Sequence, residues 1–335
     1  MFGFSEEMGK NNNSLHALFM KEKTIVILGN GFDLDLGLRT SFRNYLNSSV
    51  HAKFNVNTTT FHKIDDKSKK DWGDIEGVLR KSILEVFKIN DEELDEDINV
   101  TWNMIRKGWG IYLPEHIGHV QNLLNQISGC TFKEKSPINK NSCAYTFARK
   151  ILNWDSVFTF NYTNPADLLF GKYPNGIHFI HGSITPHRHS LCQMCKIENN
   201  IAIGVDSQRM NALIRDKELL SPIMKLHFMG EGSCRDDLNK AMLGAKNIIF
   251  FGHSMSITDS DYFEDFFHGI IEGLIVDKSF FFITKDSNGL SDIKKHMSEW
   301  GIVFDKLNNS GNQVFEIFTD NGVEDEDFKR CLDTL

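Results

Sequence analysis

The amino-acid sequence predicts an α/β protein that combines a parallel sheet with a large helical insertion. Several short apolar runs have the length of buried strands, and amphipathic segments with helical spacing lie between some of them. This alternation is typical of βαβ units, whose right-handed crossovers connect parallel strands. A long stretch after the first run holds few strand-like patterns, and it predicts the insertion.

The first predicted strand is Thr24–Leu28, an unbroken and largely β-branched run that ends at a glycine. Such runs are buried on both faces and are characteristic of parallel sheets. Further strands are expected at Val157–Phe160, Ile177–Ile180, Ile201–Val205, Asn247–Phe251, Phe280–Thr284 and Val314–Phe318. Helices are expected at Lys217–Met229, Arg235–Leu243 and Asp261–Leu274.

The predicted organisation has three parts. Residues 1–22 form an N-terminal extension, residues 23–41 and 151–335 form the nucleotide-binding domain, and residues 42–150 form the helical insertion. Amphipathic patterns inside the insertion predict helices at Ile75–Phe87, Tyr112–Ile127 and Ala144–Leu152.

Composition excludes several classes of protein. The 335 residues carry 37 Lys and Arg against 45 Asp and Glu, a formal charge of −8, without the basic footprint of a nucleic-acid-binding protein. The six cysteines are too sparse for a disulfide scaffold, so reduced thiols and a cytoplasmic location are expected. No apolar window approaches the roughly 20 residues needed to span a bilayer. A small-molecule partner is favoured, and a homo-oligomer is compatible with this composition.

The turn Gly29-Asn30-Gly31 follows the first strand and predicts a nucleotide site. Two glycines at i and i+2 let backbone amides approach a phosphate closely, and a helix is expected to begin just beyond. The standard dinucleotide fingerprint requires a third glycine where this chain has Leu34, which disfavours an ordinary dehydrogenase. The alternative is a plain strand-to-helix turn.

Two carboxylates, Asp33 and Asp35, come directly after this turn and Phe32. Because carboxylates repel a phosphate, they are expected to face ribose hydroxyls or a cationic ring, or to cap the helix. We include Gly29, Asn30, Gly31, Phe32, Asp33 and Asp35 in the predicted cofactor-binding set.

The run from Gly29 to Asp33, with Gly37-Leu38 and Thr40-Ser41-Phe42, resembles the bacteriophage abortive infection AbiH family. Further matching motifs are Trp72-Gly73-Asp74-Ile75-Glu76, Phe158-Thr159-Phe160-Asn161-Tyr162-Thr163, Ile180-His181-Gly182, Gly204-Val205-Asp206, and Gly252-His253-Ser254-Met255-Ser256 with Asp259, Asp261, Tyr262 and Phe263. This resemblance implies an antiphage effector that responds to a phage-derived trigger.

The same landmarks resemble a divergent sirtuin-type domain, which implies a Rossmann-like sheet with NAD as substrate or ligand. Matched position by position, Thr159 and Asn161 correspond to the Thr and Asn of the second sirtuin motif, and His181-Gly182 to the catalytic pair. Gly252 and Ser254 correspond to the last glycine-serine turn, so Thr159, Gly252 and Ser254 join the expected cofactor-binding residues.

Two departures from the sirtuin pattern stand out. Thr163 replaces the aspartate of the second motif, so another carboxylate must take its place or the chemistry differs. Sirtuins carry two Cys-x-x-Cys pairs, whereas this chain has only Cys192 and Cys195, and no metal is expected. Zinc ligation by these thiols with His187 and His189 is the alternative to two reduced cysteines.

The predicted function is hydrolysis of the nicotinamide glycosidic bond of NAD. Asn161 is expected to position water or the leaving amide, and His181 to act as the base near neutral pH. One alternative is a nucleotide-binding sensor or interaction module without catalysis, with Thr163 as the mark of lost activity. The other is a sirtuin-like deacylase, which the missing cysteine pair disfavours.

Overall fold

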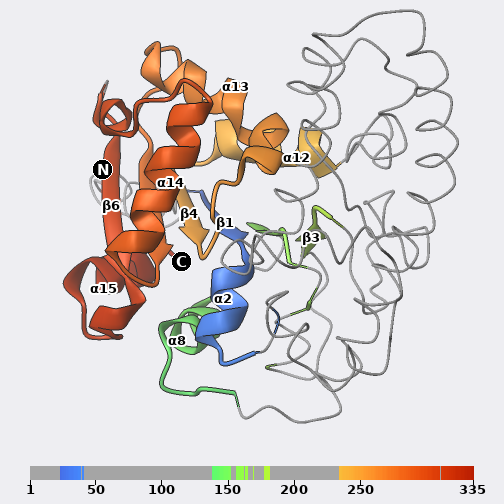
Figure 1. The fold of residues 1–335 in the computed structure, drawn as a ribbon, viewed down its shortest axis with the longest axis vertical. Helices are drawn as coiled ribbons and strands as arrows, with labels where there is room; N and C mark the ends of the chain where they lie inside the picture. The colour runs from blue at the N-terminus through green and yellow to red at the C-terminus, as the bar shows by residue number, and fades with distance from the viewer. Residues whose placement is uncertain are drawn as a thin grey trace, which may run out of the picture.

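A computed structural model describes residues 23–38, 40, 138–151, 156–161, 163–164, 169, 177–181, 234–309 and 311–335. In these described residues, six parallel strands form one sheet in the order β3-β2-β1-β4-β5-β6 (Figure 1). The strands are β1 (Thr24–Leu28), β2 (Val157–Thr159), β3 (His178–Phe179), β4 (Asn247–Phe251), β5 (Ser279–Thr284) and β6 (Gln313–Phe318). The α/β prediction and the parallel sheet are confirmed, while the strand expected at Ile201–Val205 lies outside the described residues.

The strand order is that of Rossmann-type doubly wound sheets. β1 pairs with β2 on one side and with β4 on the other, and Leu28 is in register with both Thr159 and Phe251. The chain therefore reverses its direction of winding between β1 and β4. In open parallel sheets, ligands bind at the carboxyl ends of the strands beside this switch point.

Strand residues alternate between two apolar layers. Ile25 and Ile27 belong to one core cluster, whereas Val26 and Leu28 belong to the other. This follows from the two-residue period of a strand, and it explains why the run is apolar without interruption.

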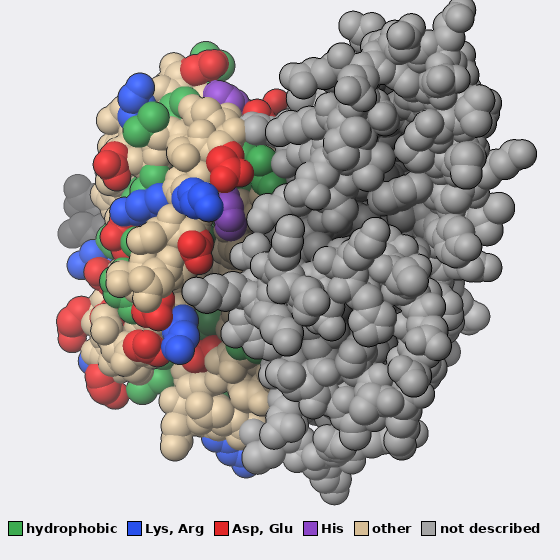
Figure 2. All heavy atoms as spheres, viewed as in Figure 1, with side chains coloured by type: hydrophobic (Ala, Val, Ile, Leu, Met, Phe, Trp, Pro, Cys, Tyr) green, Lys and Arg blue, Asp and Glu red, His purple; other side chains and the backbone are tan. Residues whose placement is uncertain are grey.

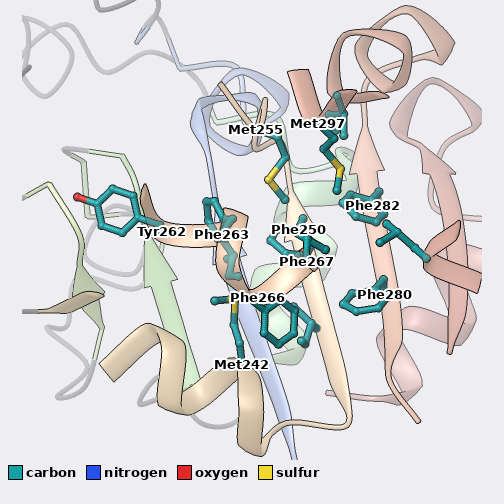
Figure 3. Packing of buried hydrophobic residues seen from close by; sticks show 14 of the residues in the cluster. Met242, Phe250, Met255, Tyr262, Phe263, Phe266, Phe267, Phe280, Phe282 and Met297 are labelled. Carbon is teal, nitrogen blue, oxygen red and sulfur yellow. The ribbon is translucent and has the colours of Figure 1, made fainter. Parts of the chain in front are cut away.

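The first layer is covered by α12 (Cys234–Gly244), α13 (Ser260–Ile271) and α14 (Ser287–Glu299). It is rich in aromatic and methionine side chains, and Figure 3 shows Phe250, Phe267 and Phe282 gathered between the sheet and these helices. Tyr262 lies at the margin of the labelled group, with its hydroxyl directed away from it. Three short 3₁₀ helices, η5 (Ile257–Asp259), η6 (Phe304–Asn308) and η7 (Thr319–Asn321), complete the described connections.

The second layer is covered by α2 (Asn30–Asp35), α8 (Cys143–Lys150) and α15 (Glu326–Asp333). α8 belongs to the end of the predicted insertion, yet Phe147 and Ala148 pack in the same core cluster as Val26 and Leu28. The helices expected at Ile75–Phe87, Tyr112–Ile127 and Lys217–Met229 lie outside the described residues. The domain boundaries stay predictions.

Helix α13 ends earlier than the sequence pattern predicts, at Ile271 rather than Leu274. Gly273 has a φ of 73°, and the amide of Leu274 donates to the carbonyl of Gly269 at 2.9 Å. This left-handed glycine closes the helix, so the apolar periodicity continues past the point where the helix stops. In the part of the chain that the structure describes, no helix is long and apolar enough to cross a membrane.

The N-terminus of α14 yields a prediction about pH and stability. Asp286 accepts hydrogen bonds from the amides of Asn288 and Gly289, both at 3.0 Å, and the bond from Gly289 is the largest factor that lowers the pKa of Asp286. A lowered pKa means that the cap stabilises the fold above the ordinary pKa and loses its effect as pH falls. We expect Asp286→Ala to lower the melting temperature at pH 7, and its difference from the parent to shrink as pH falls to about 2. Asp286→Asn retains a capping oxygen but not the charge, so at pH 7 it should lie between the parent and Asp286→Ala.

Candidate active site

Four segments with functional side chains meet at the carboxyl edge of the sheet. Gly29-Asn30-Gly31 follows β1, Asn161 follows β2, His181 follows β3, and Gly252-His253 follows β4. Because all four strands are parallel and adjacent, their carboxyl ends lie at one edge. This convergence is the one expected from the sequence.

The glycines of the β1 turn are required by the β4 turn beside it. A Cβ on Gly29 would lie 2.5 Å from the Cα of His253, and one on Gly31 would lie 2.6 Å from the Cα of Gly252. The amides of Gly29 and Gly31 donate to the carbonyls of Phe251 and Gly252, each at 2.9 Å. The sequence interpretation explained these glycines by close approach of a phosphate. The structure explains them by close approach of two backbones, and the two amides are already hydrogen-bonded within the protein.

Asp33 is a buried carboxyl group at this edge, with 1% of its surface exposed. It accepts a hydrogen bond from the side-chain amide of Asn161 at 3.0 Å and one from the hydroxyl of Thr163. Desolvation by burial raises the pKa of Asp33 to about 7, although the hydrogen bonds from Thr163 and Asn161 oppose the rise. A buried group that titrates near neutral pH is suited to proton transfer or to stabilising a cation. Asp33 therefore supplies a buried carboxyl group that is hydrogen-bonded to Thr163.

Asn161 is held in one orientation by its surroundings. Its side-chain nitrogen donates to the carbonyl of Gly29 and to Asp33, both at 3.0 Å, and its backbone amide donates to the hydroxyl of Thr159 at 3.1 Å. Both amide hydrogens of the side chain are thus donated to protein acceptors. The side-chain oxygen is the group that can receive a hydrogen bond from a ligand or water. Thr159 acts by fixing the backbone of Asn161.

A second cluster joins His181 to the segment after β4. Asp259 lies between two histidines, with Oδ1 at 3.6 Å from Nε2 of His181 and Oδ2 at 3.7 Å from Nε2 of His253. All three side chains are buried. Nδ1 of His253 accepts the amide of Met255 at 3.1 Å, so a neutral His253 carries its proton on Nε2, facing Asp259.

Phe160 packs between the two imidazoles. Its ring centroid lies 5.1 Å from that of His181 and 4.4 Å from that of His253, in both cases edge to face. Tyr262 lies 5.2 Å from Phe160 and 5.7 Å from His181. These aromatic contacts add to the contacts with Asp259 in restricting the two imidazoles.

Several residues of the predicted binding set make contacts within the fold instead of facing the site. Phe32 is buried and packs edge-on against Phe251 at 5.0 Å. Asp35 accepts the amide of Ala144 at 2.7 Å and thereby holds the first turn of α8. Burial raises the pKa of Asp35, and the hydrogen bond from Ala144 opposes this rise. Asp35 thus takes the capping role that the sequence interpretation left open, but for α8 rather than α2.

Asn30 and Ser254, two further residues of the predicted binding set, make contacts outside this cluster. Asn30 accepts a hydrogen bond from the hydroxyl of Thr40 at 2.7 Å. Ser254 is exposed, and its backbone carbonyl accepts a hydrogen bond from Nδ1 of His296 at 2.8 Å. The residue before it, His253, faces the cluster instead.

His253 and Asp259 were not among the residues predicted for the site. Both belong to the segment after β4 that carried part of the family resemblance, and this membership is the signal that could have selected them. Cys192, Cys195, His187 and His189 lie outside the described residues, so the zinc alternative stays a prediction. Within the described ranges, no group of three or more His, Cys, Asp or Glu residues is arranged to hold a metal ion.

A comparison with protein families matches the chain to bacteriophage abortive infection AbiH over residues 25–274. The chain belongs to the AbiH family. The match spans every strand end that contributes to the site, from β1 to β4, and stops before β5. The AbiH family associates the chain with bacteriophage abortive infection. No curated protein and no solved structure matches this AbiH protein significantly.

Proposed function

We propose that this AbiH protein is an antiphage effector that binds NAD at the carboxyl edge of its sheet and hydrolyses the nicotinamide glycosidic bond. The observation that carries the proposal is the buried carboxyl group of Asp33, held by Asn161 and Thr163 beside the switch point between β1 and β4. Ligands of doubly wound sheets bind at this location.

The chemistry requires stabilisation of positive charge. When the bond between C1′ of the ribose and the nicotinamide nitrogen breaks, the bonding electrons leave with nicotinamide and the ribosyl group becomes oxocarbenium-like. An ionised Asp33 facing that centre stabilises it, because the interaction is strong in a buried site with few competing waters. With a pKa of about 7, a substantial fraction of Asp33 is ionised at neutral pH.

Asn161 and His181 take complementary roles in this proposal. The side-chain oxygen of Asn161 accepts a hydrogen bond from the carboxamide of nicotinamide or from the attacking water. His181 accepts the proton that water loses as its oxygen bonds to C1′. The products are nicotinamide and ADP-ribose, and no further reactant is needed.

The hydrogen bonding of the β1 turn limits how the pyrophosphate is held. The amides of Gly29 and Gly31 donate to the β4 segment, so they do not provide the phosphate donors. Other groups must bind the pyrophosphate. On the side of the molecule in view, Figure 2 shows Lys and Arg side chains interspersed with Asp and Glu over the described residues.

The decisive experiment incubates purified protein with NAD, NADP and ADP-ribose, and follows binding and turnover by mass spectrometry. The parent is expected to release nicotinamide from NAD without any acyl-lysine acceptor. His181→Ala should reduce turnover by roughly a hundredfold or more and change nucleotide binding much less, because the substitution removes a proton acceptor.

The controls separate this proposal from its rivals. If His181→Ala releases nicotinamide as fast as the parent, the assignment of the base is wrong. Binding by the parent without hydrolysis would favour the sensor role instead. Release that requires an acyl-lysine peptide would favour deacylation.

A further inference from the structure

We infer that Asp259 is a positioning residue for His181, and that His253 in turn orients Asp259. The inference deepens the proposed function and rests on it. It assigns a role to two buried residues of the segment after β4 that the proposed mechanism does not use. The order of the group is His253, Asp259, His181, with one carboxylate oxygen facing each imidazole.

The backbone determines which nitrogen of His253 carries the proton. Its Nδ1 accepts the amide of Met255, which has a left-handed φ of 50°. A neutral imidazole has one donor and one acceptor nitrogen, so the backbone fixes the donor of His253 as Nε2. That donor lies 3.7 Å from Oδ2 of Asp259. The contact favours the ionised form of Asp259, which its burial opposes, and it sets Oδ1 as the oxygen that faces His181.

The carboxylate of Asp259 in turn determines which nitrogen of His181 carries the proton. An ionised Asp259 with Oδ1 at 3.6 Å from Nε2 favours the tautomer of His181 that carries its proton on Nε2. In that tautomer the lone pair is on Nδ1, and the inference assigns the base to this nitrogen. Both contacts are slightly longer than hydrogen bonds, as catalytic contacts often are before a ligand binds. After proton transfer, the same carboxylate stabilises the imidazolium.

Aromatic packing holds the three side chains in one arrangement. Phe160 contacts both imidazoles edge-on, so neither ring can rotate without displacing it. Asp259 is the last residue of η5, and the next residue begins α13. Its backbone is thereby anchored in a helical segment whose side chains pack in the core. The carboxylate is positioned by structure that does not depend on a ligand.

The first test reads the tautomer of His181 in the unmodified protein. With ¹⁵N-labelled histidine, the His181 signals are assigned by their absence in His181→Ala, and their chemical shifts report which nitrogen is protonated. We expect protonation of Nε2 in the parent. A neutral His181 protonated on Nδ1 would overturn the inference. This measurement needs no turnover, so it stands even if NAD proves not to be the substrate.

The second test compares Asp259→Asn with Asp259→Glu. Asp259→Asn should lower kcat by roughly ten- to a hundredfold with the Kd for NAD within about threefold of the parent, and it should shift His181 away from the Nε2 tautomer. Asp259→Glu should recover part of both readouts. An unchanged His181 tautomer and unchanged kcat in folded Asp259→Asn would contradict the inference.

Two further variants isolate the roles. Asp265→Asn removes an exposed carboxylate of α13, paired with Arg235 at 3.8 Å, and should leave turnover and the His181 tautomer unchanged. His253→Asn retains an acceptor near the amide of Met255 but removes Nε2. It should lower kcat several-fold and broaden the tautomer distribution of His181. An unperturbed His181 in this variant would remove His253 from the group.

Discussion

Asp33→Asn is expected to slow nucleotide hydrolysis by at least about a hundredfold and to raise the stability of the protein at pH 8. Turnover falls because the substitution removes the charge that stabilises the ribosyl centre. Asparagine has the size of aspartate, and its oxygen and nitrogen can still hydrogen-bond to Asn161 and Thr163. The measurements are nicotinamide release and urea unfolding across a series of pH values.

The stability effect has a definite sign. Burial raises the pKa of Asp33 from 3.8 to about 7. Below about pH 3 the group is largely neutral in the folded and unfolded chains alike, so it carries no penalty. As pH rises, the unfolded chain ionises first, and the folded state loses up to something on the order of 4 kcal/mol by pH 8. The asparagine of the variant would stay neutral, so the advantage of the variant should vanish below about pH 3 and grow toward pH 8.

Activity and stability should therefore have opposite pH dependence at this residue. Parent turnover is expected to rise with pH through an inflection near 7, as Asp33 ionises. Asp286→Asn is the control: it also removes one carboxylate, but from an exposed cap whose pKa is lowered. It should leave turnover unchanged. Full activity in Asp33→Asn would contradict the role of Asp33, and equal stability at pH 8 would contradict its raised pKa.

The sheet was predictable because its strands are buried on both faces. A central parallel strand such as β4, Asn247–Phe251, is a continuous apolar run, and its limits match the predicted ones. β3 is shorter than predicted, with two residues instead of four, and among the described strands it lies at the edge of the sheet and pairs with β2 alone. The order of the strands depends on which layer each connecting helix covers, and a local pattern does not contain that information.

The candidate site was likewise predictable from the sequence only in part. The strand ends that carry Asn161 and His181 were predictable, because parallel strands bring their carboxyl ends together. Periodicity did not reveal the partner of His181, because Asp259 reaches it from a separate helical segment; only the family motif after β4 included that residue. The reason for the glycines was also hidden. A close approach by a ligand and one by another backbone demand the same residue type, and only the structure shows Gly252 against Gly31.

Gly252→Ala is expected to prevent folding, which is the largest structural effect predicted for this edge. Gly252 has a φ of 64°, a conformation that is strained for alanine. Its Cβ would also overlap backbone atoms, including the Cα of Gly31 at 2.5 Å and the amide nitrogen of Phe32. Backbone atoms in a hydrogen-bonded turn cannot move aside as a flexible side chain can. We expect a loss of more than about 4 kcal/mol, measured as insoluble expression or loss of cooperative unfolding.

Gly301→Ala separates the two causes of this effect. Gly301 follows α14 with a φ of 80°, but the nearest atom to an added Cβ is Cε1 of His268 at 3.8 Å, an ordinary contact. This variant has the conformational strain without the overlap, so it should fold and lose only about 1–2 kcal/mol in urea unfolding. Gly252→Ala with a loss as small as that of Gly301→Ala would mean that the β1 and β4 turns can separate. The close contact that places Asn161, His181 and His253 around a common edge would then not be a fixed feature of the fold.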